Sequence, residues 1–246
     1  MNRIVVIGGG NVAASLVPAL GDRVVQVYSR THAHAEELAP GRATDCLDSV
    51  TADADVYIIT LVDDAVAPTA QRLARLNPGA LWVHTSGSVP IEALEPLGPR
   101  RGVVYPLQTF SRGRRRDFAD IPIFIEGDDP AVGLLARSLS RRVLEADSAR
   151  RRRLHIAAVF GCNFVNHLWA IADRLLGDDG MSFDLLEPLL RETLDKAVET
   201  GPRSGQTGPA RRGDTRVMES HKKMLPPELA DLYSRLSESI IKMYRQ

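Results

Sequence analysis

Cysteine is scarce in this chain. The two cysteines, Cys46 and Cys162, lie far apart, and neither belongs to a Cys-x-x-Cys motif or a Cys/His cluster. This distribution argues against a zinc site and against a disulfide framework. We therefore expect no bound metal and a reducing, cytoplasmic setting.

The chain also lacks an excess of charge of either sign. Its 31 Lys and Arg balance its 31 Asp and Glu, so the formal net charge is zero and gives no global case for binding nucleic acid or an anionic membrane. Arginine runs occur at 112–116 and 150–153, but they lack the interleaved aromatics of a base-stacking surface. We interpret both runs as solvated faces and expect no nucleic-acid partner.

Long hydrophobic runs are absent as well. No apolar run reaches the roughly 18 residues that a membrane span requires. The first twenty residues contain Asn11 and a glycine cluster in place of a signal-peptide pattern. We expect a cytoplasmic protein with no membrane partner.

The first 149 residues alternate two kinds of segment. Short runs rich in Val and Ile, bounded by turn residues, predict strands at 3–8, 23–29, 54–62, 80–86, 102–107 and 121–127. Helical patterns fall between them at 11–20, 31–39, 65–76, 91–97 and 129–140. This alternation predicts an α/β fold with a Rossmann-type, mostly parallel sheet covered on both faces.

The pattern changes after residue 149. Three long stretches with apolar periodicity, 150–176, 183–199 and 226–245, follow without a convincing strand among them. We predict two domains in this chain of 246 residues. Residues 1–149 form a dinucleotide-binding Rossmann domain, and residues 150–246 form an all-helical domain for substrate binding and dimerisation.

A glycine motif follows the first predicted strand. Gly8, Gly10 and Ala13 give G-x-G-x-x-A, in which the first glycine permits the tight turn and the second lets the backbone approach a pyrophosphate. The small third residue allows helix and strand to pack closely. Because the motif opens a helix within a βαβ unit, it predicts a dinucleotide site at Gly8, Gly10, Asn11, Val12 and Ala13. The alternative is a glycine turn that only packs.

The end of the second predicted strand indicates which dinucleotide binds. NAD-selective proteins usually carry Asp or Glu there, and that carboxylate repels a 2′-phosphate. This chain has Ser29, Arg30 and Thr31 instead, a guanidinium between two hydroxyls that suits a phosphate. We predict NADP(H) in preference to NAD(H); the alternative is that Arg30 is a solvated loop arginine.

Polar residues also follow the later strands, where ligands of open α/β sheets bind. Asp63 and Asp64 are interpreted as helix caps, and the alternative is a functional carboxylate pair. His84 is a candidate proton donor or substrate ligand, and the alternative is a structural, hydrogen-bonding histidine. The other residues expected at this edge are cofactor contacts from Leu61, Val62, Thr85 and Ser86, with Ser88, Tyr105 and Thr109 beside them and Gln108 as a substrate ligand.

The helix predicted from about residue 150 has a polar face. On a regular α-helix Asn166 lies about 20° from His155 and Asn163 about 80° from it. Burying such groups requires partners, so they form either a core network or a substrate or nicotinamide pocket at the domain cleft. We list His155, Asn163 and Asn166 as candidate catalytic residues, with His167 in support.

A polar, glycine-rich segment near the C-terminus is too hydrophilic to be core. It contains Thr207, Gly208, Arg211, Arg212 and Asp214. We predict that Thr207, Arg212 and Asp214 bind substrate, in a loop that reaches a pocket of its own subunit or of a partner.

Several segments together resemble a family of Rossmann-like NADP-dependent oxidoreductases without an assigned substrate. The segments are GGGNVA, SRT, ADVYIITLVDDAV, HTSGS, YPLQTF, HIAAVFGCNFVNHL and TGPARRGDTRVMESH. The resemblance covers nearly the whole chain. It implies a Rossmann domain joined to a helical domain similar to the C-terminal part of 6-phosphogluconate dehydrogenases, and a homodimer formed through helices. Pyrroline-5-carboxylate reductases, 3-hydroxyisobutyrate dehydrogenases and deazaflavin-dependent NADP reductases belong to the same superfamily.

One departure bears on the reaction. The β-hydroxyacid branch of the superfamily places a catalytic lysine four residues before an asparagine, but here Val159 precedes Asn163 and Cys162 precedes Asn166 at that spacing. We predict hydride transfer between NADP(H) and a small polar carbonyl or imine in the cleft between the domains. Two alternatives stay open, a non-catalytic NADP-binding sensor and a deazaflavin-linked NADP reductase.

Overall fold

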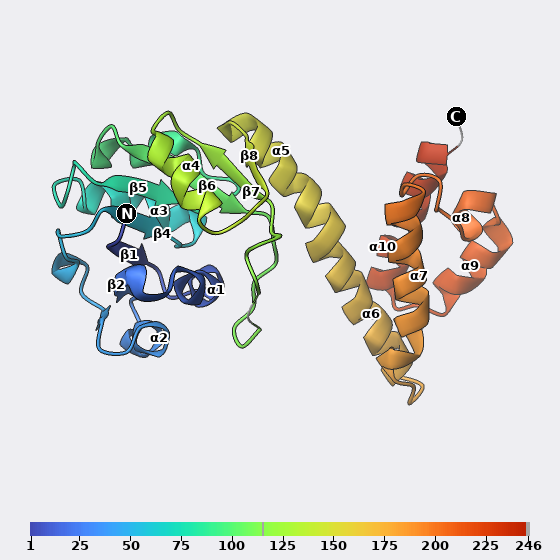
Figure 1. The fold of residues 1–246 in the computed structure, drawn as a ribbon. Coiled ribbons are helices and arrows are strands. Elements are labelled where there is room, and N and C mark those ends of the chain that lie inside the picture. Colours follow the sequence, from blue (N-terminus) through green and yellow to red (C-terminus); the bar gives the residue numbers. More distant parts are fainter. Residues whose placement is uncertain (115, 245–246) are drawn as a thin grey trace. The chain divides into compact units, whose positions relative to one another are not determined.

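The computed structural model describes residues 1–114 and 116–244 (Figure 1). Contacts divide the chain into two compact units, Met1–Leu168 and Trp169–Gln246. The division falls within a helix, beyond the domain boundary expected at 149/150. The boundary between two independent domains at 149/150 therefore stays a prediction.

An eight-stranded sheet forms the centre of the first unit. The strands lie in the order β3-β2-β1-β4-β5-β6-β7-β8, and every neighbouring pair is parallel except β6 and β7. The predicted α/β fold with a mostly parallel sheet is confirmed. The strands are β1 Ile4–Ile7, β2 Val24–Tyr28, β3 Ala43–Thr44, β4 Val56–Ile59, β5 Leu81–His84, β6 Arg101–Pro106, β7 Ile123–Glu126 and β8 Val143–Glu145.

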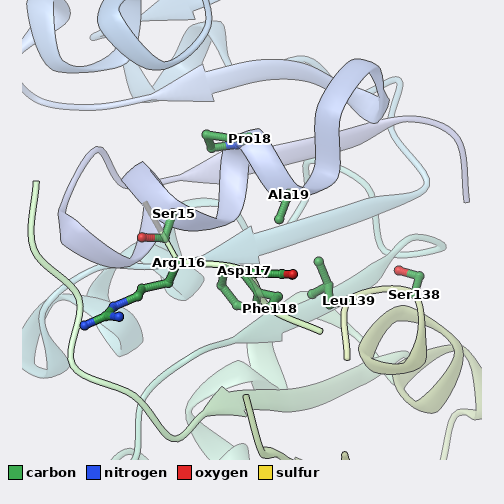
Figure 2. A pocket seen from close by; sticks show the side chains of 8 residues that line it. All are labelled: Ser15, Pro18, Ala19, Arg116, Asp117, Phe118, Ser138 and Leu139. Carbon is green, nitrogen blue, oxygen red and sulfur yellow. The ribbon is translucent and has the colours of Figure 1, made fainter. Parts of the chain in front are cut away.

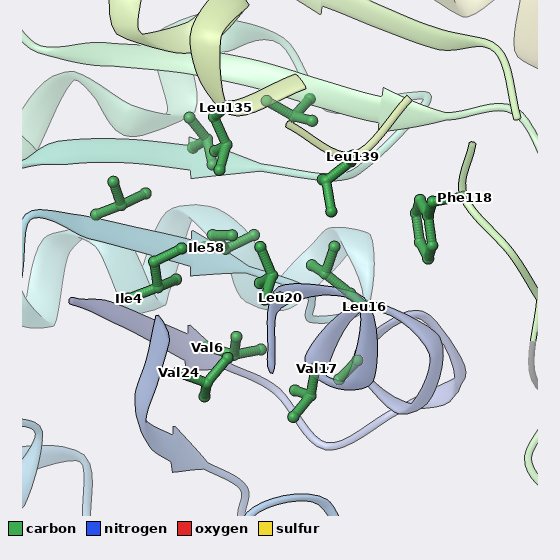
Figure 3. Packing of buried hydrophobic residues seen from close by; sticks show 14 of the residues in the cluster. Ile4, Val6, Leu16, Val17, Leu20, Val24, Ile58, Phe118, Leu135 and Leu139 are labelled. Atoms are coloured by element: carbon green, nitrogen blue, oxygen red, sulfur yellow. The ribbon is translucent and has the colours of Figure 1, made fainter. Parts of the chain in front are cut away.

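Both faces of the sheet are covered, which explains why the central strands β1 and β4 are apolar at every position. Ile4 and Val6 of β1 point into one cluster, where they pack with α1 and α4 (Figure 3). Val5 and Ile7 point into the opposite cluster, together with residues of α3 and η3. The helices of this part are α1 Asn11–Leu20, α2 His32–Leu38, α3 Asp63–Arg72 and α4 Pro130–Arg137, with 3₁₀ turns η1 Gly21–Arg23, η2 Leu47–Ser49 and η3 Ile91–Leu97.

A continuous helix follows β8 from Ser148 to Gly177. It consists of α5 (Ser148–Ala158), the π-helical turn η4 (Val159–Phe164) and α6 (Val165–Gly177). Within the described residues this one helix is long and apolar enough to cross a membrane by length and composition, and none of its most apolar part is buried in the single chain. The expectation that no apolar run is long enough for a membrane span is wrong for this helix, in which polar residues are scattered among apolar ones.

The second unit is helical, as predicted. After α6 it contains η5 Phe183–Leu186, α7 Glu187–Glu199, α8 Pro209–Arg212, α9 Thr215–Lys223 and α10 Pro227–Tyr244. α10 packs against α8 and α9. Many large apolar side chains here remain exposed, among them Leu185, Leu189, Leu194 and Val198 of the η5–α7 segment.

Candidate functional site

The turn from β1 into α1 requires a glycine at its first position. Gly8 has φ +130° and donates its N–H to the Tyr28 carbonyl oxygen at 2.8 Å. A Cβ at this position would lie 2.5 Å from Thr60 Oγ1, so a side chain would be both strained and obstructed. Gly8 therefore fixes the glycine turn against the neighbouring strand ends.

The start of α1 offers backbone donors to an anion. Gly10 is the N-cap residue, with no side-chain cap, and a Cβ there would meet nothing within 4 Å. The first helical hydrogen bond runs from Ala14 N to Gly10 O, so the N–H groups of Asn11, Val12 and Ala13 precede the helical ladder. Such groups and the helix dipole favour a phosphate.

A cavity of about 330 Å³ adjoins this turn. Its lining includes residues predicted as cofactor contacts, namely Gly8, Gly10, Ser29, Arg30, Thr31, Leu61 and Val62, and it adds Gly9, Tyr28, His34, Thr60, Ala65 and Thr69. Ser29 is buried, whereas Arg30 and Thr31 are exposed. Thr31 is the N-cap residue of α2 but makes no capping bond through its side chain. The hydroxyls and guanidinium at the end of β2 thus fit a phosphorylated ribose, and the described lining contains no carboxylate to oppose it.

His84, the last residue of β5, is fully buried. Its Nδ1 accepts the Ser86 N–H at 3.2 Å, so the hydrogen of a neutral ring lies on Nε2, which has no hydrogen-bond partner within the described residues. Burial, together with the nearby Arg151 charge, lowers the pKa of His84 to about 4. At neutral pH His84 is therefore an uncharged hydrogen-bond donor and not an imidazolium.

Ser86 links two strand ends. Its Oγ donates to Asp63 Oδ1 at 2.7 Å and accepts the N–H groups of Ser88 and Val89, each at 3.0 Å. Asp63 is the first residue of α3, while Val62 holds the N-cap position, so the interpretation of Asp63 as a cap is wrong. Its carboxylate ties the loop after β4 to the loop after β5.

Tyr105 and His155 meet at the end of β6. The Tyr105 hydroxyl lies 3.0 Å from His155 Nδ1, and the two rings are arranged edge to face. Burial raises the pKa of Tyr105. A Cβ at Gly87 would come within 2.7 Å of His155 Nδ1, so the glycine lets the loop after β5 approach this pair. The sequence placed Tyr105 at this edge and His155 in a polar face, but gave no sign that they form a pair.

Arg151 anchors the start of α5. It is fully buried, forms an ion pair with Glu126, and donates to the Val89 carbonyl oxygen at 2.5 Å and to Ser148 Oγ at 3.3 Å. Glu126 also accepts the Ser148 N–H at 2.9 Å. The interpretation of run 150–153 as a solvated face is thus wrong for Arg151. In the first run Arg112 and Arg114 are exposed, as that interpretation expects, and Arg115 lies outside the described residues.

Other predicted site residues are dispersed. Asn163 lies in the π-helical turn and Asn166 just after it, and both are exposed, as is His167. A π-type turn accommodates an extra residue, which displaces later side chains by about 100° from the regular helix assumed above. His155 and Asn166 are therefore not aligned as that regular helix predicts.

Three predicted substrate ligands belong to the second unit. Thr207 and Arg212 are exposed, and Asp214 caps α9 by accepting the Val217 N–H at 3.2 Å. In the first unit, Gln108 is exposed and accepts the Thr109 N–H at 2.8 Å, while Thr85 is buried. Within the described residues no group of three or more His, Cys, Asp or Glu could hold a metal ion.

The strand order, the glycine turn and the cavity beside it define a Rossmann-type dinucleotide-binding protein. A family model described as a domain of unknown function, DUF2520, matches residues 121–240. The structure of a "putative NADP oxidoreductase" from Bacteroides fragilis is similar over 98% of both chains, with 44% sequence identity and a TM-score of 0.93. The chain belongs to this family of Rossmann-like NADP oxidoreductases, and the family predicted from the motifs is confirmed.

More distant structures share the fold. A protein from Thermotoga maritima matches over 98% of both chains with 21% identity and a TM-score of 0.72. An imine reductase from Myxococcus stipitatus, in complex with NADP⁺, matches over 99% of this chain and 93% of its own, with 15% identity and a TM-score of 0.65. No curated protein matches the chain in sequence.

Proposed function

We propose that this protein is an NADP(H)-dependent oxidoreductase that reduces a small polar carbonyl or imine, or catalyses the reverse reaction. The observation that carries the proposal is the cavity beside the glycine turn, which combines a phosphate-binding helix start with Arg30, Ser29 and Thr31. Family membership supports NADP(H) as the cofactor. Imines are a class to test first because fold relatives include imine reductases and reductive aminases.

The polar groups for the chemistry lie at the ends of β5 and β6. When bound, the nicotinamide supplies or takes up a hydride, and the substrate nitrogen or oxygen then gains or loses a proton. We assign that proton to Tyr105, whose buried hydroxyl stays protonated at neutral pH. In the reduction, the O–H bond of Tyr105 breaks as the substrate's N–H or O–H bond forms, which leaves a phenolate. A solvent proton restores the hydroxyl, and His155, whose Nδ1 lies 3.0 Å away, is placed to relay it by releasing a proton from one ring nitrogen as the other takes one up.

This assignment predicts a separation of binding from turnover. Tyr105→Phe should lower kcat about 100-fold or more, because it removes the general acid, while the dissociation constant for NADPH changes less than about twofold. NADPH oxidation is followed by absorbance with imines, keto acids and aldehydes, and binding by fluorescence titration. His84→Asn is the matched control. The asparagine keeps an acceptor for the Ser86 N–H, and His84 transfers no proton in this assignment, so kcat should be retained.

The two alternative functions give different results. A sensor binds NADPH tightly but turns over no substrate in the panel, and the absence of a lysine before Asn163 or Asn166 favours this outcome. A deazaflavin-linked reductase exchanges hydride only with that coenzyme. Full activity of Tyr105→Phe would rule out Tyr105 as the proton donor without affecting the proposed reaction class.

We also propose that the protein is a homodimer, with a second copy covering exposed apolar helices. The most apolar part of the helix Ser148–Gly177 is not buried in the single chain, and Phe160, Phe164 and Trp169 are exposed on it. A bilayer is a poor cover, because the same helix exposes Asn163 and Asn166, whose amides would lose their hydrogen bonds in hydrocarbon. A second protein surface can satisfy both kinds of side chain.

A further inference from the structure

Arg112 reaches the glycine turn from a distant part of the chain. It lies in the connection between β6 and β7, and one of its terminal nitrogens donates to the Gly9 carbonyl oxygen at 2.5 Å. The other pairs with Glu37 Oε2 of α2 at 2.6 Å. The connection returns along α1, where residues 116–118 face Ser15, Pro18 and Ala19 across a hollow of about 280 Å³ (Figure 2).

Gly9 connects Arg112 with the cavity at the end of β2. A Cβ built on Gly9 would lie 2.8 Å from Ser29 Cβ and 3.2 Å from His34 Cβ, and all three residues line the cavity with Arg30 and Thr31. In a Rossmann domain this end of β2 receives the adenosine ribose, whereas the pyrophosphate lies at the start of α1. Arg112 does not itself line the cavity, but it contacts Gly9, which does, and it pairs with Glu37 of α2, the helix that contributes His34 to the lining.

The present partners of Arg112 are exchangeable. The Arg112 side chain is 34% exposed and that of Glu37 63% exposed, and ion pairs at such positions are weak because water screens them. A guanidinium has five N–H donors, of which these two bonds use two. A phosphate bearing up to two negative charges is a stronger partner than one solvated carboxylate.

We propose that Arg112 is a second guanidinium for the 2′-phosphate of the cofactor, held in place by Glu37 until NADP(H) binds. The assignment rests on the proposed NADP(H) function. Arg30 comes from the end of β2 and Arg112 from the connection after β6, so two segments distant in sequence select the phosphorylated dinucleotide. Glu37 competes with the 2′-phosphate for Arg112, so the strength of the Arg112–Glu37 ion pair determines how readily Arg112 becomes available to the cofactor.

The test compares dissociation constants for NADP⁺ and NAD⁺, measured by calorimetry, in wild type and variants. Arg112→Ala is expected to weaken NADP⁺ about tenfold and NAD⁺ less than about twofold, with Arg30→Ala behaving in the same way. Arg114→Ala, an exposed arginine two residues further along, is the control and should change neither constant. Thermal unfolding of each variant verifies that the fold is intact.

Two results would overturn the assignment. Equal weakening of NADP⁺ and NAD⁺ would place Arg112 at the pyrophosphate or make it a support of the glycine turn, and unchanged NADP⁺ binding would leave it without a cofactor role. Wild type that binds neither dinucleotide would instead defeat the proposed function itself. Glu37→Gln should tighten NADP⁺ about threefold and leave NAD⁺ unchanged; weaker NADP⁺ binding would contradict competition by Glu37.

Discussion

At the scale of single residues, His84 shows how burial determines what a side chain can do. The ring is fully buried, and the pKa of about 4 means that it is neutral in the folded protein near pH 7. In the unfolded chain the same ring has a pKa near 6.5. Between these two values the unfolded state binds a proton that the folded state excludes.

This difference predicts an acid-sensitive stability. The contribution of His84 is fully present above about pH 6.5 and is lost as the pH falls toward 4, with a total of about 3 kcal/mol for a shift of this size. Urea unfolding between pH 7 and pH 4.5 should give a steeper fall for wild type than for His84→Asn. Parallel curves for the two proteins would show that His84 is not the group responsible.

The sequence predicted the residues at the cofactor's ribose better than the residues proposed for proton transfer. Arg30 and its flanking hydroxyls follow a strand in a recognisable motif, so their place beside the glycine turn could be predicted. The Tyr105–His155 pair joins residues 50 positions apart, and Arg112 lies 103 positions from Gly9. Such contacts depend on how loops and helices cross the sheet edge, which no local pattern specifies.

At the scale of elements, Arg151 determines which face of α5 looks inward. Arg151 and His155 are four residues apart, so they lie on the same face of the helix. The buried ion pair of Arg151 with Glu126 therefore orients the face that carries His155 to Tyr105. A structural contact at the start of the helix thus positions a side chain one turn later.

Removing one partner of the Arg151–Glu126 ion pair should lower the free energy of unfolding. Arg151→Met is expected to lower the free energy of unfolding by about 3–5 kcal/mol, because it leaves the largely buried Glu126 carboxyl group without its ion-pair partner. Adding Glu126→Gln should restore part of that loss. Arg153→Ala, at an exposed position on the same helix, should stay within about 0.5 kcal/mol of wild type in the same urea titration. Equal effects at Arg151 and Arg153 would contradict the anchoring role.

The hydrophobic periodicity of the sequence predicted the main strands and helices, but it missed two short strands and the π-helical turn. The central strands and α1 are apolar runs bounded by turn residues, and they appear where expected. β3 has two residues and β8 has three, too short to show a pattern of their own. The π-helical turn at Val159–Phe164 interrupts a stretch that reads as one regular helix, and it changes which residues share a face.

At the scale of the whole molecule, the exposed apolar helices make oligomeric state a direct test. We expect light scattering after gel filtration to give twice the chain mass of 26.9 kDa. Exposed apolar positions of the long helix are the ones to alter, and Phe160→Glu with Phe164→Glu should shift the equilibrium to monomer by placing charge in the interface. A monomeric wild type that floats with liposomes would favour a membrane as the cover.

The reversal of strand direction between β6 and β7 has a consequence for chain length. Antiparallel neighbours can be joined by a tight loop of about two to five residues, because the second strand begins where the first one ends. Pro106 pairs directly with Ile123, so the connection here runs from Leu107 to Pro122, sixteen residues. Topology leaves most of that length unexplained, and connections this long usually serve a function. The surplus is what lets an arginine cross to Gly9, three strands away in the sheet. The same connection places Phe118 and Ile121 in the core, so replacing all of it with a tight turn would remove buried apolar contacts together with Arg112.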